Sequence, residues 1–259
     1  MSVLSDERYA EELRGCTAAL AAIACPDLTR PVPTCPGWTL RELVTHVGRG
    51  HRWAAEIVAT RSPEFISPRD VPGGKLPDGQ AEQEAWLNAS ADLVAEKVVV
   101  APEAPVWTFI GSRPARFWVR RRAHEAAVHL LDAQLAAGQE ISLAAGFAAD
   151  GIAEWLELVA ANPQAAAALA QARAGRGDGE TLHVHATDPG LDGAGEWLVR
   201  LGPDGITAEP GHAKAGVAVR GPAARLLAVL TRRLPPSDPA VEVFGDETLL
   251  ADWLAHTPF

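Results

Sequence analysis

The spacing of apolar residues changes once along this 259-residue chain, and that change limits the folds it can form. Up to about residue 173, apolar residues recur at steps of three and four, as from Tyr9 to Leu13. Beyond the glycine-rich segment 175–179, apolar and polar residues alternate instead. The first spacing is typical of helices and the second of strands with one buried face. We therefore predict an α+β chain, with a helical domain over residues 1–174 and a smaller α+β domain over residues 180–259.

Local signals mark the ends of the predicted helices. Ser5 can cap the first helix, and Thr39 with Glu42 forms a capping box at the start of the second. Pro114 suits the first turn of the fourth helix, because the amide hydrogen that proline lacks has no helical partner there. We expect helices over residues 5–24, 39–60, 79–99, 114–137 and 142–162, and a short helix that ends near residue 173.

The C-terminal part alternates in short segments that are separated by turn residues. Two helical segments interrupt the alternation, one from Pro222 and one from Asp246. We expect strands over residues 181–187, 196–201, 205–208, 215–220 and 241–244.

Charge and apolar content exclude several classes of protein. A formal net charge of −10 disfavours nucleic acid and anionic membranes as partners, because both attract basic surfaces. No long apolar run without charges is present and the N-terminus lacks a signal-peptide pattern, so we expect no membrane association. Cys16, Cys25 and Cys35 form no regular framework, which is typical of reduced thiols. We expect a cytoplasmic protein with a small-molecule substrate, and the sequence leaves its oligomeric state open.

Three residues from two predicted helices form a candidate metal site. Glu125 and His129 are four apart, which places them on one helix face, and His46 comes from another helix. Two histidines and a carboxylate suit zinc or another divalent metal, and three protein ligands leave one position vacant for catalysis. Alternatively, Glu125 and His129 form an ordinary surface pair, since this spacing is common. The apolar neighbours of His46, Leu43 and Val47, favour the metal site.

Other residues could compete with these ligands or support them. Glu42 has the right spacing to His46 but is accounted for by the capping box, and His51 is nearby in sequence. His124 points about 100° away from Glu125 and cannot join the same ion. Asp132 is either a residue that orients His129 or a surface salt-bridge partner. His183 and His185 share one strand face, but no third ligand is evident near them.

Two longer motifs carry a resemblance to a known family. Residues 32–48 read VPTCPGWTLRELVTHVG, and residues 117–133 read FWVRRRAHEAAVHLLDA. Together with EWLVR at 196–200, VAVRG at 217–221 and VFGD at 243–246, they resemble the mycothiol-dependent maleylpyruvate isomerase family over nearly the whole chain. The resemblance implies a DinB-like four-helix bundle with a divalent metal, followed by a smaller α+β domain akin to sterol-carrier proteins. The family's metal ligands fall on His46, Glu125 and His129, the same three residues that spacing indicates.

The resemblance also implies a chemistry and further site residues. Enzymes of this family use mycothiol, whose thiolate adds to a double bond and leaves again, or is transferred to an electrophile. Arg220 is the candidate for a catalytic arginine from the second domain, with Arg232 as the second choice. Arg121 and Trp38 are candidates for cofactor binding, because an arginine binds carboxylates bidentately and a tryptophan can line a pocket. Only one or two of the three consecutive arginines at 120–122 can face a site.

Three functions remain open from the sequence. The first is a mycothiol-dependent isomerase or S-transferase with zinc or another divalent metal, acting on a small electrophile. The segment 230–234 departs from the glycine–arginine ending often found in the family's isomerases. This departure counts against maleylpyruvate isomerase activity and is compatible with an S-transferase. The second is a metal-dependent hydrolase that activates water, and the third is a non-catalytic protein that binds a small ligand. Cys35 is expected to organise the turn before the second helix rather than to act as a nucleophile.

Overall fold

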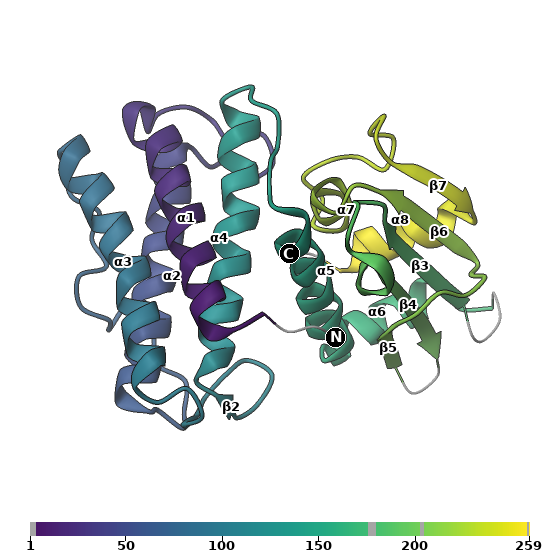
Figure 1. The fold of residues 1–259 in the computed structure, drawn as a ribbon, viewed down its shortest axis with the longest axis horizontal. Helices are drawn as coiled ribbons and strands as arrows, with labels where there is room; N and C mark the ends of the chain where they lie inside the picture. The colour runs from purple at the N-terminus through teal and green to yellow at the C-terminus, as the bar shows by residue number, and fades with distance from the viewer. Residues whose placement is uncertain (1–3, 176–179, 203–204, 258) are drawn as a thin grey trace. The chain divides into compact units, whose positions relative to one another are not determined.

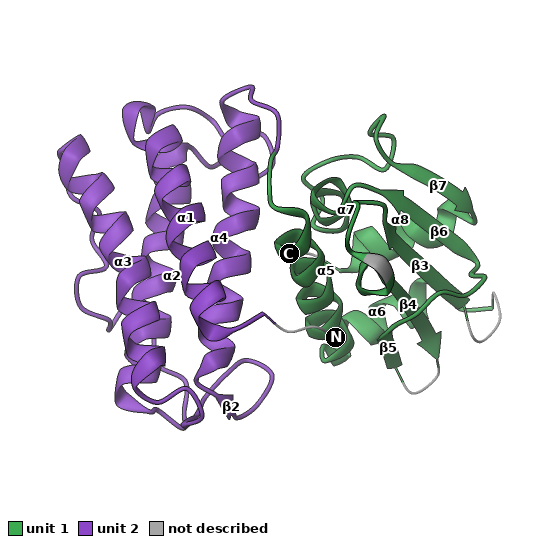
Figure 2. Cartoon of the chain, in the orientation of Figure 1, with its two compact units in different colours: residues 1–3, 142–259 green, residues 4–141 purple. Residues whose placement is uncertain are grey.

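The computed structural model describes residues 4–175, 180–202, 205–257 and 259, and they form two compact units. Figure 2 shows the units, Leu4–Ile141 and Ser142–Phe259. The division therefore lies more than thirty residues before the predicted boundary at 174–180. Part of that predicted boundary, residues 176–179, lies outside the described residues. The difference arises because α5 (Ala145–Ala160) and α6 (Pro163–Ala172) pack against elements of the C-terminal unit.

The described part of the N-terminal unit is built on a bundle of four α-helices (Figure 1). Helix α1 packs against α3 and α4, and α2 packs against the same two helices. Their bounds are Asp6–Ala24 for α1, Leu40–Thr60 for α2, Gln80–Val100 for α3 and Arg116–Ala136 for α4. The apolar faces of all four helices meet in one core, in which Leu13, Leu43, Leu87 and Leu131 are fully buried. Helices α2 and α3 approach closely at Gly48, where a Cβ atom would overlap the ring of Trp86.

The predicted helix starts are confirmed at α1 and α2. The Ser5 side chain accepts a hydrogen bond from the Arg8 amide, and Thr39 and Glu42 form the capping box. The prediction for Pro114 is wrong, because this residue lies in a short hairpin of β1 (Pro105–Val106) and β2 (Arg113–Pro114). Its extended backbone delays the start of α4 to Arg116.

The connection between α1 and α2 is folded tightly against the bundle. A short 3-10 turn, Cys25–Asp27, follows α1, and the Leu40 amide then donates to the Arg30 carbonyl at 2.8 Å. The tip of the connection turns at Gly37, whose φ of 82° favours glycine. This connection holds Thr34 and Cys35 beside α4.

The C-terminal unit contains a five-stranded sheet in the order β5-β4-β3-β6-β7 among its described residues. Strands β3 and β6 pair in parallel, and the other neighbours are antiparallel. The strands are β3 (Glu180–Ala186), β4 (Glu196–Gly202), β5 (Gly205–Pro210), β6 (Val217–Gly221) and β7 (Glu242–Gly245), with helices α7 (Ala223–Leu230) and α8 (Glu247–His256). Together with the helical bundle, this unit confirms the predicted α+β class.

The alternation along β3 separates a buried face of the sheet from a polar face. Leu182, Val184 and Ala186 are at most 5% exposed, and β3 and β6 pack against α7. His183 and His185 take the intervening positions and therefore lie on the opposite face. In the described residues, no helix is long and apolar enough to cross a membrane.

Candidate metal centre

The structure brings His46, Glu125 and His129 together in the N-terminal bundle. Their donor atoms all lie within 4.8 Å of one another. His46 Nε2 lies 3.0 Å from Glu125 Oε1, and the ring centroids of His46 and His129 are 5.0 Å apart. Helix α2 supplies the first residue and α4 the other two, at the contact between these helices. The spacing argument thus identified three side chains that do meet.

Glu125 is held ionised by its neighbours. Its Oε2 atom lies 2.6 Å from a terminal nitrogen of Arg122 and 3.6 Å from Nε of Arg121. Burial alone would raise the pKa of Glu125, but Arg122, the hydrogen bond with His46 and Arg121 outweigh it and hold that pKa well below its usual value. A negatively charged carboxylate is the form that binds a cation.

Asp132 orients His129 from a fully buried position. Its Oδ2 atom lies 2.8 Å from His129 Nδ1, and the Thr34 hydroxyl donates to its other oxygen. The Cys35 thiol also donates to Asp132, at 3.6 Å. Because a carboxylate can only accept, the hydrogen of His129 sits on Nδ1, which leaves Nε2 as the nitrogen that can coordinate. Of the two interpretations of Asp132, the geometry supports the orienting residue and not a surface salt bridge.

Burial also sets the protonation of His129. It lowers the pKa of the imidazole, and the hydrogen bond and charge of Asp132 offset only part of that effect. His129 is therefore neutral near pH 7, as a metal ligand must be.

His51 contacts a residue that holds the cluster and does not compete with the three candidate ligands for a metal ion. The Arg122 Nε–H donates to His51 Nδ1 at 3.0 Å, and His51 Nε2 lies 3.2 Å from the Thr17 hydroxyl. Burial and the nearby Arg122 hold the pKa of His51 well below its usual value, so the ring is neutral. Since both ring nitrogens are engaged, His51 is not a ligand. Its hydrogen bond fixes the position of the Arg122 guanidinium, and the ion pair with Arg122 fixes the Glu125 carboxylate.

The supporting roles of Arg122, His51 and Thr34 were not predicted from the sequence. A weak signal for Arg122 was present, because it precedes Glu125 by three residues and so shares its helix face. Nothing in the sequence links Thr34 to Asp132, which the fold of the connecting loop brings together. His124 behaves as predicted: it is absent from the cluster and meets the Tyr9 ring edge-on, with centroids 5.9 Å apart.

The other candidate residues occupy different surroundings. The Trp38 ring lies beside the cluster, with its centroid 5.2 Å from that of His46. Arg121 is buried beside Glu125. Arg220 belongs to β6 of the C-terminal unit and forms an ion pair with Glu242 at 2.7 Å. Arg232 follows α7 in a left-handed backbone conformation, with φ of 63°.

The surroundings of the three cysteines of the bundle determine which of their thiols could act as a nucleophile. Burial raises the pKa of the Cys16 thiol to about 12 and that of Cys25 to about 11, so neither forms a thiolate near pH 7. Cys35 is engaged with Asp132, and its backbone shapes the turn as predicted, since the Trp38 amide donates to its carbonyl at 2.9 Å. Cys16 and Cys25 therefore supply no thiolate to this centre.

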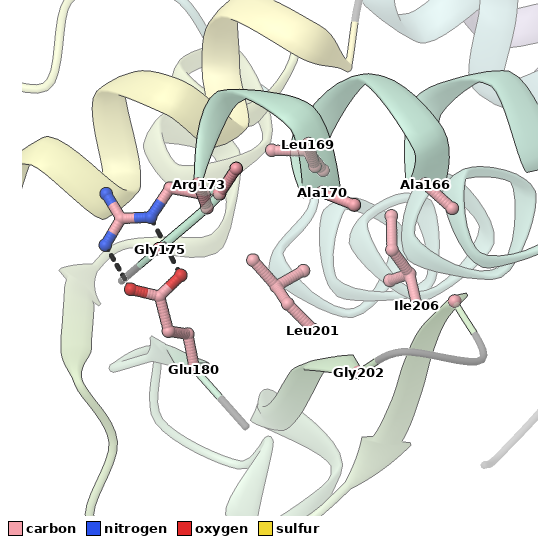
Figure 3. Close-up of a pocket in the computed structure, with 11 residues that line it drawn as sticks. Ala166, Leu169, Ala170, Arg173, Gly175, Glu180, Leu201, Gly202 and Ile206 are labelled. Carbon is pink, nitrogen blue, oxygen red and sulfur yellow. Dashed lines mark hydrogen bonds and ion pairs between the residues drawn. The ribbon is translucent and has the colours of Figure 1, made fainter. Parts of the chain in front are cut away.

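A cavity of about 460 Å³ lies in the C-terminal unit between α6 and strands β4 and β5 (Figure 3). Leu169, Leu201 and Ile206 give it an apolar wall. At one end, Arg173 donates to Glu180 at 2.8 Å and also pairs with two aspartates of the same unit. The charged groups are thus used to join elements, and the described lining contains no group of metal ligands.

The fold and the cluster define a class: a two-unit α+β protein whose helical bundle carries a candidate three-ligand metal centre. The model of the mycothiol maleylpyruvate isomerase N-terminal domain matches residues 9–134, and that of the MDMPI C-terminal domain matches residues 146–252. These matches span most of the chain, which belongs to the mycothiol maleylpyruvate isomerase domain family. The resemblance noted in the sequence is thereby confirmed.

Solved structures agree with this assignment at the level of the fold. A crystal structure of a mutant mycothiol-dependent maleylpyruvate isomerase matches with a TM-score of 0.54 and 16% identity, covering 93% of both chains. A second crystal structure of the mycothiol-dependent maleylpyruvate isomerase matches with a TM-score of 0.53 and 18% identity, again covering 93% of both chains. No curated protein matches the chain in sequence.

Proposed function

We propose that this protein is a metal-dependent enzyme that uses mycothiol to isomerise, or to transfer the thiol to, a small electrophile. The observation that carries the proposal is the cluster of His46, Glu125 and His129, supported by buried partners, in a chain of this family. A cytoplasmic location, as the sequence predicts, is part of the proposal.

The residues of the cluster fit a zinc ion. With zinc–ligand bonds of about 2.1 Å, the donor atoms of a tetrahedral site are about 3.4 Å apart. The 3.0 Å between His46 Nε2 and Glu125 Oε1 needs only a small opening to reach that value. Two imidazoles and one carboxylate are suitable donors, and they leave one position for a further ligand. Bound there, zinc would lower the pKa of a thiol and so supply a thiolate near neutral pH.

The protein's own residues would position the reacting groups. Arg122 fixes the Glu125 carboxylate, and Asp132 fixes the ring of His129. Trp38 offers a flat apolar surface beside His46 for part of the thiol cofactor. We assign Arg220 to catalysis on the basis of the family resemblance. We assign Arg121 to cofactor binding because a guanidinium can bind a carboxylate of the cofactor or the substrate bidentately.

The chemistry requires no redox partner. In isomerisation, the thiolate adds to one carbon of a cis double bond conjugated to a carbonyl, and the electrons move to the carbonyl oxygen. The resulting single bond rotates, the carbonyl reforms, and expulsion of the thiolate gives the trans double bond. In S-transfer, a carbon–sulfur bond forms in the same way, but the product is protonated or a leaving group departs, so the thiol is consumed.

The first experiment measures metal content by elemental analysis on tag-free wild type and the His129→Ala variant. We expect the variant to lose one equivalent of zinc per chain while its circular dichroism spectrum is unchanged. His256→Ala, which alters a histidine of α8 outside the cluster, serves as the matched control and should keep the wild-type content. Equal zinc content in wild type and His129→Ala would contradict the proposed ligand set.

The second experiment tests the thiol. Purified protein is offered mycothiol together with cis-unsaturated dicarbonyl compounds or alkylating electrophiles. We expect turnover of at least one class, dependent on the thiol and lost in His129→Ala. Activity that persists without any thiol would instead select the metal-dependent hydrolase. Metal bound in the bundle by four protein ligands, with no turnover, would select a non-catalytic protein.

A further inference from the structure

Three histidines surround one glutamate on the polar face of the sheet in the C-terminal unit. His183 and His185 alternate along β3, and the register of β3 with β4 sets His185 opposite Glu196. The connection from β5 to β6 brings the third histidine, His212. It is delivered there because the Gly211 amide donates to the Glu196 carbonyl at 3.1 Å. The four side chains therefore come from three segments that backbone hydrogen bonds hold in place.

The distances within this group are short. Glu196 Oε2 lies 2.9 Å from His183 Nε2 and 2.5 Å from His212 Nδ1. Its other oxygen lies 3.9 Å from His185 Nε2. The donor atoms of His183, Glu196 and His212 are all within 4.8 Å of one another. The donor atoms thus gather in one small volume, and a cation among them would take the place of the two hydrogen bonds as the contacts open to about 3.4 Å.

We propose that His183, Glu196 and His212 form a second metal site, with His185 as a fourth donor, that takes a late first-row divalent cation such as Zn²⁺. Imidazole nitrogens with one carboxylate oxygen suit zinc, nickel, copper and cobalt, and not calcium or magnesium, which prefer oxygen donors. The site shares no residue with the centre in the N-terminal bundle.

Two of the donors are largely buried and held in place, and the third is exposed to solvent. His183 is buried on the strand at the middle of the sheet, so its position is fixed by the ladders on both sides. Glu196 is largely buried, whereas the His212 side chain is 74% exposed. A cation can therefore enter past His212 and bind to donors that are already positioned. Once bound, it would fasten the connection between β5 and β6 to the sheet.

The sequence analysis considered His183 and His185 and found no third ligand near them. Glu196 and His212 supply it, but only through the pairing of β3 with β4 and the return of the chain after β5. The expectation that His183 and His185 lack a third ligand is therefore wrong.

The test uses full-length, tag-free protein that carries His129→Ala, so that zinc binding in the bundle does not mask the second site. After removal of metal with a chelator, Zn²⁺ is titrated against a chromophoric competitor. We expect one equivalent to bind, and we expect His212→Ala or Glu196→Gln to weaken its affinity at least tenfold. His256→Ala, in the same unit but outside the group, should leave the affinity unchanged.

Two further measurements keep the test decisive. His212 is exposed and Gln has the shape of Glu, so both variants should fold, which circular dichroism can verify. In the same background, Co²⁺ should give visible absorption bands that shift or vanish in His212→Ala. Zinc and cobalt binding that is the same with and without these two substitutions, or no binding at all, would overturn the proposal.

Discussion

Asp132 is the residue on which the orientation of His129 depends. Replacing it by asparagine keeps its shape but removes the charge that favours a hydrogen on His129 Nδ1. We expect Asp132→Asn to bind zinc in the bundle about 10- to 100-fold more weakly, as is usual for residues that hold a ligand in place. Competition titration on protein that carries Glu196→Gln isolates this site. Asp92→Asn, which alters an exposed partner of Arg14, is the control. Unchanged affinity in Asp132→Asn would refute the orienting role.

The buried imidazole of His51 makes stability depend on pH. Its folded-state pKa lies well below 6.5, so below pH 6.5 the unfolded chain takes up a proton that the folded chain does not. The free energy of unfolding therefore falls as the pH falls, by about 1.4 kcal/mol per pH unit from this residue. We expect wild-type protein, unfolded by urea in the presence of a chelator, to lose about 2 kcal/mol more than His51→Gln between pH 7 and pH 5. Equal losses in the two proteins would contradict this assignment.

At the level of single residues, the sequence predicted the three members of the bundle cluster and offered Asp132 as an orienting residue, but it did not predict the other residues around them. Glu125 and His129 share a helix face by their spacing alone, and the apolar neighbours of His46 favoured it as the third ligand before the family motif pointed to the same residue. Thr34 and Asp132 lie far apart in sequence, and no periodic signal connects them. His212 lies in a loop and likewise has no periodic signal that connects it to Glu196. Only the strand register reveals that the two residues are close. Ligands that helix spacing and helix neighbours indicate are thus predictable, whereas partners that a loop or a strand register brings in are not.

At the level of elements, the start of α2 is fixed by the capping box, and α2 carries His46. Removing the Thr39 hydroxyl leaves an amide of the first turn without its acceptor. We expect Thr39→Ala to lower the free energy of unfolding by about 1 kcal/mol. Thr45→Ala, on the same helix, removes a hydroxyl that only bonds back to the Arg41 carbonyl, and should change it by less than about 0.5 kcal/mol. Urea titrations measure both, and equal effects would contradict the capping role.

Elements with strong local signals were predictable, and the hairpin of β1 and β2 was not. The starts of α1 and α2 follow from side-chain caps that the sequence displays. Strands of two residues leave no alternation to detect, and a proline at the end of one resembles a helix start. The paired strands of the second unit were found because β3 and β4 run for seven residues each, long enough for their mixed apolar and polar residues to be recognised between turns.

At the level of the whole molecule, the two units have separate cores, and the division after Ile141 can be tested with fragments. We expect residues 1–141 and residues 142–259 to fold when they are expressed separately. The fragment 1–174, which follows the boundary predicted from the sequence, would carry α5 and α6 without α7 and β5, against which they pack. It should therefore expose apolar surface and aggregate. Dispersion in NMR spectra and size-exclusion chromatography distinguish these outcomes, and a soluble, monomeric 1–174 alongside an unfolded 142–259 would favour the other boundary.

The donors of the bundle cluster lie on two helices that are separated in the chain by α3 and the hairpin. His46 and Glu125 meet only after α2 and α4 have docked, and we predict that a cation gains its full set of donors after the transition state of folding. Interactions that form after the transition state change the rate of unfolding and leave the rate of folding nearly unaltered. Stopped-flow refolding should therefore proceed at the same rate with and without zinc, while unfolding slows. The lifetime of the folded bundle, and not the speed at which it forms, would follow the supply of metal.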